Sequence, residues 1–386
     1  RLYRVPFLRR KQFAHHCLNG FHRTSRRVAS AAKATSIVMN LPSEYRKLVC
    51  VRVTPNFREA VSVVTERTPK LERDEVFLKT KYAGINASDV NVTSARYSEA
   101  TPPFNVGIES VAEVVAVGDD VKHLPVGSAV ATINVPGFGA FSEYQRILAS
   151  KAFPIPKAVP EAIPLLISGL TAAIGLDEQG RIKEGETVLI TAAAGGLGHL
   201  AVQWAKAAKC HVIGTCSSPE KEVYLKSIGC DKVINYKTHD LGAELEKSYP
   251  NGVDVVWETI GGKTFEVLLN HLNIRGRLVV VGAITGYQGT DKALPDVKLD
   301  DLPSKLLMRS ASVSGFFLPQ YYHLFPEYVA KLQKMLQDGT ISPKVDFGLN
   351  AVGGDLKGLD GCIRGIEYLH TGKSVGKVVV KLDEYA

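Results

Sequence analysis

A glycine-rich turn is the part of the sequence with the clearest chemical potential. It reads Ala192-Ala193-Ala194-Gly195-Gly196-Leu197-Gly198 and joins an apolar run to an amphipathic stretch. Laid on the pattern G-x-G-x-x-G, it places Ala193, Gly195 and Gly198 at the three glycine positions. Gly195 would let the backbone approach a pyrophosphate, and Gly198 would let the helix pack closely on the strand. The helix N-terminus would add free N–H groups and a partial positive charge, so the turn predicts a dinucleotide site.

The end of the next predicted strand, at Cys216, indicates which dinucleotide binds. An NAD site usually carries Asp or Glu at this point for the ribose hydroxyls, whereas this chain has Ser217, Ser218 and, shortly afterwards, Lys221. A lysine ammonium neutralises a 2′-phosphate and a serine donates hydrogen bonds to it, so the segment favours NADP over NAD. Tyr236, after the third predicted strand, would add a hydroxyl or cover the adenine. The alternatives are a turn without a ligand, serines that only cap a helix, and a solvated lysine.

Strand-like and helix-like segments alternate from residue 186 onwards. The strand-like runs are apolar and β-branched, as in a parallel sheet that is buried on both faces, and the first helix-like segment has its apolar residues at a spacing of 3.6. This alternation predicts a doubly wound α/β domain with right-handed crossovers. The predicted strands are 187–193, 211–216, 231–236, 254–259, 276–284 and 311–317, and the predicted helices are 197–209, 219–229, 240–248 and 263–271.

Residues 46–150 have a different pattern, with short β-branched or alternating runs between Gly, Pro and Asp turns. Regular short strands of this kind predict a partly open barrel or sandwich. Beyond Pro319 the chain has two helix-like segments and a final strand, 377–382, which would complete the β-rich domain. We therefore expect an α/β plus β fold, with the β-rich domain split around the doubly wound domain. The expected boundaries are 1–43 for a leader, 44–167 for the first part of the β-rich domain, 168–318 for the α/β domain and 319–386 for the rest of the β-rich domain.

Charge is unevenly distributed along the chain. The 386 residues carry a formal net charge of +8, but the first 43 contain nine Lys or Arg and no Asp or Glu. The other residues therefore include 47 − 9 = 38 basic and 39 acidic side chains, a net of −1, which removes the main support for nucleic-acid binding. An Arg-rich, acid-free leader with Ser, Thr and Ala is typical of a mitochondrial transit peptide. The alternatives are a solvated basic tail and a peroxisomal or cytoplasmic protein.

Composition and cysteine spacing exclude further classes of protein. With 45% apolar and 22% charged residues, the chain is neither disordered nor collagen-like. Its longest charge-free apolar stretch, 162–176, is shorter than an integral membrane helix needs. The six cysteines are at least six residues apart, with no CxxC and no HExxH. No zinc site has its usual ligand spacing, so no metal is expected.

Four short motifs, in their order and spacing, resemble the medium-chain dehydrogenase/reductase family. They are Gly84-Ile85-Asn86-Ala87-Ser88-Asp89, Gly107-Ile108-Glu109, the glycine-rich turn, and Gly376-Lys377-Val378-Val379. Segments 54–61, 210–218, 234–238 and 305–318 are similar to the zinc-free quinone oxidoreductase and prostaglandin reductase branch of that family. The resemblance implies a GroES-like catalytic domain split around a Rossmann domain, usually in a homodimer. It also implies a zinc-free site, because the Cys and His ligands of the zinc-dependent relatives are absent from the first two motifs.

The resemblance further implies a set of NADP contacts. The contact positions are Leu197, Ser217, Lys221, Tyr236, Thr259, Val281, Tyr287, Phe316, Phe317, Leu318 and Ser374, and the turn and its neighbour add Ala193, Gly195, Gly196, Gly198 and Ser218. Leu197 replaces a hydroxyl residue of the related turn and would contribute only its backbone N–H. Ser374 replaces an asparagine and, being shorter, would lose a nicotinamide contact.

The reaction implied by the resemblance is hydride transfer from NADPH to the β-carbon of an α,β-unsaturated ketone, as in 15-oxoprostaglandin 13-reduction. The partner would be a small enone or oxo-lipid. Without a metal, hydrogen-bond donors must stabilise the enolate oxygen. Tyr287, after a Gly-Ala-Ile-Thr-Gly turn, is the leading catalytic candidate, followed by Tyr97 and Asn86. The alternatives are packing for Tyr97 and turn capping for Asn86; for the whole protein they are quinone reduction at the same site and NADPH binding without catalysis.

Overall fold

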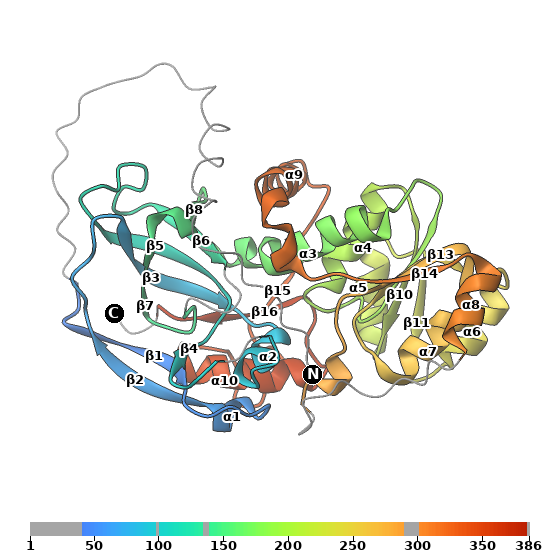
Figure 1. Ribbon diagram of the computed structural model, residues 1–386, viewed down its shortest axis with the longest axis horizontal. Helices are drawn as coiled ribbons and strands as arrows, with labels where there is room; N and C mark the ends of the chain where they lie inside the picture. Colours follow the sequence, from blue (N-terminus) through green and yellow to red (C-terminus); the bar gives the residue numbers. More distant parts are fainter. Residues whose placement is uncertain (1–40, 98–99, 134–138, 289–300, 384–386) are drawn as a thin grey trace, which may run out of the picture. The chain divides into compact units, whose positions relative to one another are not determined.

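The structure is a computed structural model that describes residues 41–97, 100–133, 139–288 and 301–383. It contains a six-stranded parallel sheet, a seven-stranded sheet and a three-stranded sheet (Figure 1). The leader predicted at 1–43 lies almost entirely outside the described residues.

The parallel sheet has the strand order β11-β10-β9-β12-β13-β14, and all of its pairs are parallel. Its strands are β9 (Thr187–Ile190), β10 (His211–Cys216), β11 (Lys232–Asn235), β12 (Val253–Glu258), β13 (Leu272–Val280) and β14 (Ser312–Gly315). Each of the six predicted strands is therefore present. The order reverses at β9, so the glycine-rich turn after β9 lies at the switch point where α/β sheets bind ligands.

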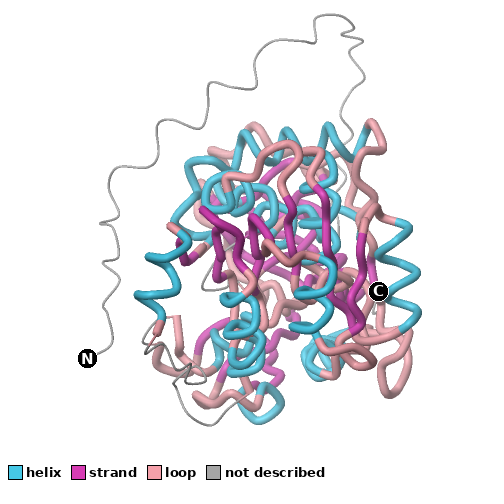
Figure 2. The backbone as a smooth tube through the Cα atoms, turned by 90° about the vertical axis from the view of Figure 1, so that its right-hand side faces the viewer, coloured by secondary structure: helices cyan, strands magenta, loops and turns pink. Residues whose placement is uncertain are grey.

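Helices cover both faces of this sheet, as Figure 2 shows. They are α4 (Gly198–Ala207), α5 (Pro219–Ser227), α6 (Leu241–Ser248) and α7 (Gly262–Asn270). Successive side chains of β9 point to opposite faces of the sheet, which explains why helices pack on both faces. Val188 packs in one core with Leu200 of α4, whereas Leu189 packs in another with Phe265 of α7. All four predicted helices are present, and Gly229 after α5 has a φ of +102°, as a helix-ending glycine requires.

The other sheets form the β-rich part of the fold. The seven-stranded sheet has the order β15-β16-β3-β5-β6-β8, with β7 paired to β3, and the small sheet has the order β2-β1-β4. The strands are β1 (Glu44–Cys50), β2 (Val61–Arg67), β3 (Glu75–Gly84), β4 (Phe104–Asn105), β5 (Glu109–Val117), β6 (Ala129–Ile133), β7 (Tyr144–Leu148), β8 (Ala152–Pro154), β15 (Val345–Asp346) and β16 (Lys377–Lys381). The C-terminal strand β16 pairs antiparallel with β3. The β-rich part is thus split around the parallel sheet, as predicted; the exact boundaries stay predictions.

Several shorter elements were not predicted. They are α1 (Phe57–Ala60), α2 (Ser88–Thr93), α3 (Ile167–Gly175), α8 (Leu302–Arg309), and the short 3-10 or π-helical segments η1 (Ala149–Lys151), η2 (Pro160–Leu165), η3 (Leu176–Gly180), η4 (Ile284–Gly286) and η5 (Leu318–Leu324). The two predicted tail helices are α9 (Phe325–Gln337) and α10 (Gly358–His370). The helical run Pro160–Gly180 is long and apolar enough to cross a membrane, but 72% of its most apolar window is buried inside the fold. It therefore forms part of the protein core.

Candidate active site

The glycine-rich turn has the geometry that a bound pyrophosphate needs. The first helical hydrogen bond of α4 runs from His199 N to Gly195 O at 3.1 Å, so the preceding amides at residues 196–198 lie at the open helix end. A Cβ at Gly198 would lie 2.4 Å from the carbonyl oxygen of Ala192 and 2.6 Å from the Cα of Ala193, so only glycine fits there. The residues present fit a dinucleotide.

The C-terminal segment braces this turn. Gly376 N donates to Ala194 O at 2.8 Å, and Gly195 and Gly376 form an isolated parallel bridge. Lys377 is the next residue, and its Cα and side-chain Cδ lie close to Gly196. The loop before β16 therefore joins the β-rich part of the fold to the predicted cofactor turn.

His199, in the first turn of α4, is a residue that sequence reasoning missed. Its side chain is fully buried, Nδ1 lies 2.9 Å from Gly195 O, and Nε2 accepts from Lys344 N at 3.1 Å. The second bond makes Nδ1 the protonated nitrogen that donates to Gly195. Burial lowers the pKa of His199 to about 4, so the imidazole is neutral at pH 7. It positions the turn rather than supplying charge to a phosphate.

The buried imidazole predicts a specific dependence of stability on pH. Because folding lowers the pKa of His199 from 6.5 to about 4, the unfolded chain binds more protons between these values. The contribution of His199 is therefore present above pH 6.5 and is lost as the pH falls towards 4, by up to about 1.4 kcal/mol per pH unit. Urea unfolding of wild type and His199→Asn from pH 7.5 to 4.5 measures it.

The difference between the two curves isolates His199 from other groups. Burial raises the pKa of Asp89 to about 8, so the contribution of Asp89 to stability increases as the pH falls from 7.5 to 4.5. This contribution is the same in wild type and in His199→Asn, and it cancels in the difference. We expect the stability advantage of wild type to shrink as the pH falls. Parallel curves would show that the imidazole does not titrate in this way.

The residues predicted at the adenosine end lie close to the start of α5. Ser218 is the N-cap of α5, and its Oγ accepts from Lys221 N at 3.4 Å. Lys221 is only 9% exposed, and its Nζ donates to Gly372 O at 2.5 Å, in the loop before Ser374. Burial lowers the pKa of the Lys221 ammonium. Capping by Ser218 is thus shown and solvation of Lys221 is excluded; a contact with a 2′-phosphate remains a prediction.

Other predicted contacts line the carboxyl edge of the parallel sheet. Thr259 Oγ1 lies 3.0 Å from Thr191 Oγ1, so the hydroxyls that follow β12 and β9 meet at that edge. The remaining predicted contacts differ in burial: Phe316, Leu318 and Ser374 are buried, Ser217 and Val281 are half-buried, and Tyr236 and Phe317 are exposed. Phe316 stacks on Tyr321 at 4.7 Å, so packing accounts for its ring.

The structure brings the two predicted catalytic tyrosines to one place. The Tyr97 ring lies 5.4 Å from the Phe317 ring, and Tyr97 and Tyr287 are close enough to interact electrostatically. Burial raises the pKa of Tyr97, so its phenol stays protonated. The Tyr287 hydroxyl accepts from Ala283 N at 3.1 Å, which braces the turn after β13. The Tyr97 hydroxyl therefore keeps a proton that it can donate to an enolate oxygen.

Asn86 has a different environment from the tyrosines. Its Nδ2 donates to Glu109 Oε1 at 2.9 Å, and its Oδ1 accepts from Lys377 Nζ at 2.6 Å. Lys377 and Glu109 also form a fully buried ion pair at 2.6 Å. A Cβ at Gly84 would lie 2.3 Å from Glu109 Oε1, so glycine makes room for the carboxylate. Both ends of the Asn86 amide are used by this cluster, and its predicted catalytic role gains no support from the geometry.

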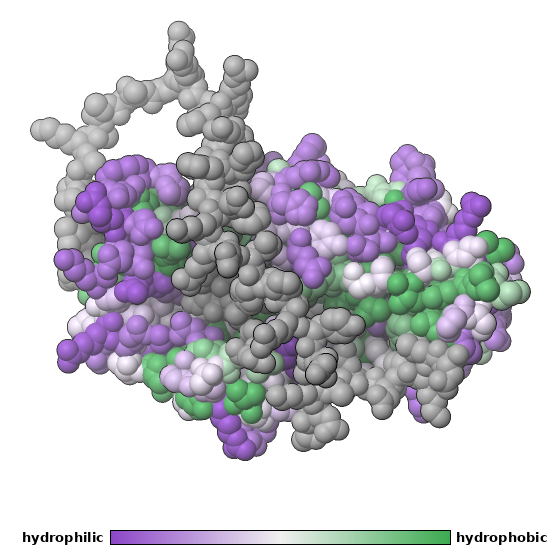
Figure 3. Space-filling model, in the orientation of Figure 1, coloured by the Kyte–Doolittle hydropathy of each residue, from purple (hydrophilic) through white to green (hydrophobic). Residues whose placement is uncertain are grey.

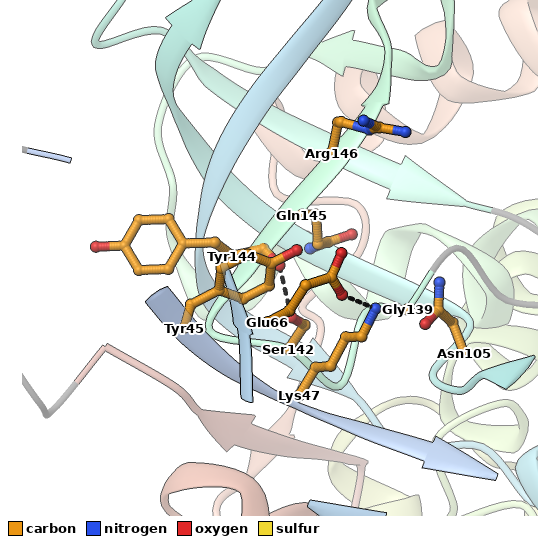
Figure 4. Close-up of a pocket in the computed structure, with 9 residues that line it drawn as sticks. All are labelled: Tyr45, Lys47, Glu66, Asn105, Gly139, Ser142, Tyr144, Gln145 and Arg146. Carbon is orange, nitrogen blue, oxygen red and sulfur yellow. Dashed lines mark hydrogen bonds and ion pairs between the residues drawn. The ribbon is translucent and has the colours of Figure 1, made fainter. Parts of the chain in front are cut away.

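Neither a metal cluster nor the polar pocket in Figure 4 offers a competing site. Among the described residues, no three His, Cys, Asp or Glu side chains gather as ligands for an ion. The pocket in Figure 4 contains none of the predicted site residues, and an ion pair between Lys47 and Glu66 crosses it. Its lining is Tyr45, Lys47, Glu66, Asn105, Gly139, Ser142, Tyr144, Gln145 and Arg146, a polar set that does not suit an enone.

Known proteins match most of the chain. The alcohol dehydrogenase GroES-like domain family matches residues 72–157, and the zinc-binding dehydrogenase family matches residues 196–334. Prostaglandin reductase-3 of Bos taurus is 46% identical over 345 residues, which cover 89% of this chain and 90% of the relative. The chain belongs to the medium-chain dehydrogenase/reductase superfamily. The fold that the sequence motifs implied, a GroES-like domain with a Rossmann domain, is therefore confirmed.

Two further members of the superfamily support the same assignment. A probable quinone oxidoreductase of Leishmania amazonensis is 40% identical and covers 89% of this chain and 100% of the relative. The crystal structure of Escherichia coli quinone oxidoreductase complexed with NADPH superposes with a TM-score of 0.74 at 29% identity, covering 87% of this chain and 99% of that chain.

Proposed function

We propose that this protein is an NADPH-dependent reductase of the carbon–carbon double bond of α,β-unsaturated ketones, with 15-oxo-lipids as the substrate class. The carrying observation is that Tyr97 of the GroES-like part and Tyr287 of the Rossmann part lie around one arginine: Arg96 donates to Tyr287 O and, through Asn91, is linked to the Tyr97 hydroxyl. The relative named prostaglandin reductase-3 and the NADPH complex of the E. coli enzyme support the substrate class and the cofactor.

Different residues of the chain have different roles in the proposed reaction. The bound cofactor supplies the hydride. The turn at Gly195 and Gly198 would hold the pyrophosphate, and Lys221 would bind the 2′-phosphate. The phenols of Tyr97 and Tyr287 donate hydrogen bonds to the enolate oxygen as charge develops there.

The experiment that tests this function is NADPH oxidation by purified protein. We expect turnover with a 15-oxo-lipid enone and the saturated ketone as the product, with little turnover of quinones. Faster reduction of quinones would select the quinone reductase, which the Leishmania relative favours. Tight NADPH binding without turnover on either class would indicate a non-catalytic NADPH-binding protein.

The leading catalytic candidate gives a direct prediction. Tyr287→Phe removes the hydroxyl and should lower kcat about tenfold, because one neutral donor to an enolate is lost. Stopped-flow measurement of NADPH oxidation gives the hydride-transfer rate, and the thermal unfolding midpoint reports the lost bond to Ala283 N. An unchanged kcat with a lowered midpoint would make Tyr287 a structural brace only.

The proposed reaction needs no metal. The absence of the Cys and His ligands in the GroES-like motifs supports this part of the proposal. Activity should survive dialysis against a chelator, and elemental analysis should find less than one zinc per chain. Loss of activity that zinc restores would overturn it.

We also propose a homodimer formed through the edge of the parallel sheet. Strand β14 is the last in its sheet, and among the described residues no strand pairs with its outer side. Leu307 and Met308 of α8 are 78% and 82% exposed, and Figure 3 shows a hydrophobic band over this end of the Rossmann part. An open edge beside apolar side chains suits a second copy of the chain. Light scattering of wild type and Met308→Glu tests it.

The basic leader supports a mitochondrial location. Nine positive and no negative side chains in residues 1–43 are the composition that import recognises. A fluorescent protein carrying residues 1–43 should enter mitochondria in cells. Peroxisomal or diffuse cytoplasmic fluorescence would refute the location without affecting the proposed reaction.

A further inference from the structure

Arg96, just after α2, joins the two parts of the fold at the predicted active site. Its Nη1 donates to Tyr287 O at 2.6 Å and its Nη2 to Gly286 O at 3.1 Å. Both carbonyls belong to the turn after β13 of the Rossmann part, whereas α2 belongs to the GroES-like part. A single cation thus holds the turn that carries one catalytic candidate.

The same guanidinium also acts on the other candidate tyrosine. Arg96 Nη1 lies 2.9 Å from Asn91 Oδ1, and Asn91 Nδ2 donates to the Tyr97 hydroxyl at 3.0 Å. These bonds have one direction, because Arg96 only donates and Tyr97 is the acceptor. The phenol proton of Tyr97 remains available to a further acceptor. The chain of donors therefore polarises the Tyr97 O–H and makes it a stronger hydrogen-bond donor.

The surroundings make these bonds strong. Asn91 is 2% exposed, and Tyr287 packs in one core with Ile85 and Val90. Hydrogen bonds to an ionised donor are about twice as strong as neutral ones, and a chain of bonds in a buried site polarises its members. Arg96 is the ionised donor of this chain of bonds, and Asn91 is its buried member.

We propose that Arg96 is a positioning residue for the reductase reaction, which holds Tyr287 in place through two backbone carbonyls and strengthens Tyr97 as a donor through Asn91. This inference rests on the proposed function, because the tyrosines matter only if an enolate forms. The planar guanidinium suits three acceptors in different directions, which a lysine ammonium on a flexible stem does not reproduce.

The first experiment removes the guanidinium with Arg96→Met. In the protein without cofactor, amide hydrogen exchange should become faster in peptides that cover residues 282–288, because the two carbonyls lose their donor. In the loaded enzyme, kcat should fall at least about tenfold while the KM for the enone changes little. Guanidinium added well below denaturing concentrations should restore part of kcat to Arg96→Met.

Arg73→Met is the matched control for the loss of an arginine. Arg73 forms its ion pair with Asp120 on the surface, with 73% of its side chain exposed. In Arg73→Met, amide hydrogen exchange over residues 282–288 and kcat should equal those of wild type. Arg96→Lys should recover only a small part of the lost activity.

The second experiment separates the two actions of Arg96. Asn91→Asp keeps an oxygen acceptor for Arg96 but removes the N–H that donates to Tyr97 and places an anion beside it. Hydrogen exchange over 282–288 should stay as in wild type, whereas kcat should fall about tenfold. Arg96→Met with unchanged exchange and kcat would overturn the proposal, and Asn91→Asp with wild-type kcat would remove the polarising action. If wild type reduces no enone, the proposed function fails, while hydrogen exchange still tests whether Arg96 holds the turn at Gly286 and Tyr287.

Discussion

Lys377→Met is expected to lower the free energy of unfolding by about 3–5 kcal/mol, because it leaves the Glu109 carboxylate buried without its cation. The two side chains are 3% and 0% exposed and lie 2.6 Å apart. Glu109 would keep its bonds from Asn86 Nδ2 and Ile167 N, both at 2.9 Å, but neither partner carries a charge.

The measurement is urea unfolding at pH 7.5, followed by fluorescence and circular dichroism. Lys226→Met is the control, because Lys226 pairs with Glu222 on the surface of α5 and should cost less than about 1 kcal/mol. Lys377→Met combined with Glu109→Gln should recover much of the loss, since the buried charge is then gone. A single variant as stable as the control would contradict the role of the ion pair.

Loss of Lys377 should also affect the cofactor site. Lys377 Nζ holds Asn86, and the residue before it bonds to Ala194 of the glycine-rich turn. NADPH affinity should therefore fall together with stability. The cluster explains why a lysine lies buried here: it joins Glu109 of β5 and Lys377 of β16 to Asn86, two residues beyond the end of β3.

Lys221→Ala is expected to weaken NADPH binding ten- to a hundredfold while NADH binding changes little. A charged hydrogen bond to a phosphate is worth about 1.5–3 kcal/mol, and NADH lacks the 2′-phosphate. Lys221 is 9% exposed at the start of α5, next to Ser217 and Ser218, where an NAD enzyme would carry an acid. Titration of protein fluorescence with each cofactor gives the two dissociation constants.

The ratio of the two constants isolates the phosphate contact. Lys221 also donates to Gly372 O, so a purely structural loss would weaken both cofactors equally. Lys226→Ala, five residues further along α5, should leave both constants unchanged. Equal losses for NADPH and NADH in Lys221→Ala would assign the lysine to the loop at Gly372 alone.

Local pattern was enough to predict most of the fold. Strands such as β9, β10 and β12 were predictable because buried parallel strands need continuous apolar runs, and α4 because its apolar residues repeat with the helical period. Short elements were missed for the same reason: α2 has six residues and α1 four, too few for a period to appear. Their helical form depends on packing, since short helices are marginal on their own.

The sequence by itself determined the charge balance, the alternation of strands and helices, and the dinucleotide turn, because each depends on residues close together in the chain. Only the tertiary structure decided which of the site residues come into contact. Asn86 and Lys377 are separated by 291 positions, and Arg96 and Tyr287 by 191. No local sequence pattern predicts such pairs, since they form only when β16 pairs with β3 and the turn after β13 packs against the segment after α2. That packing turned Asn86 into part of a buried charge cluster and placed Arg96 beside both tyrosines.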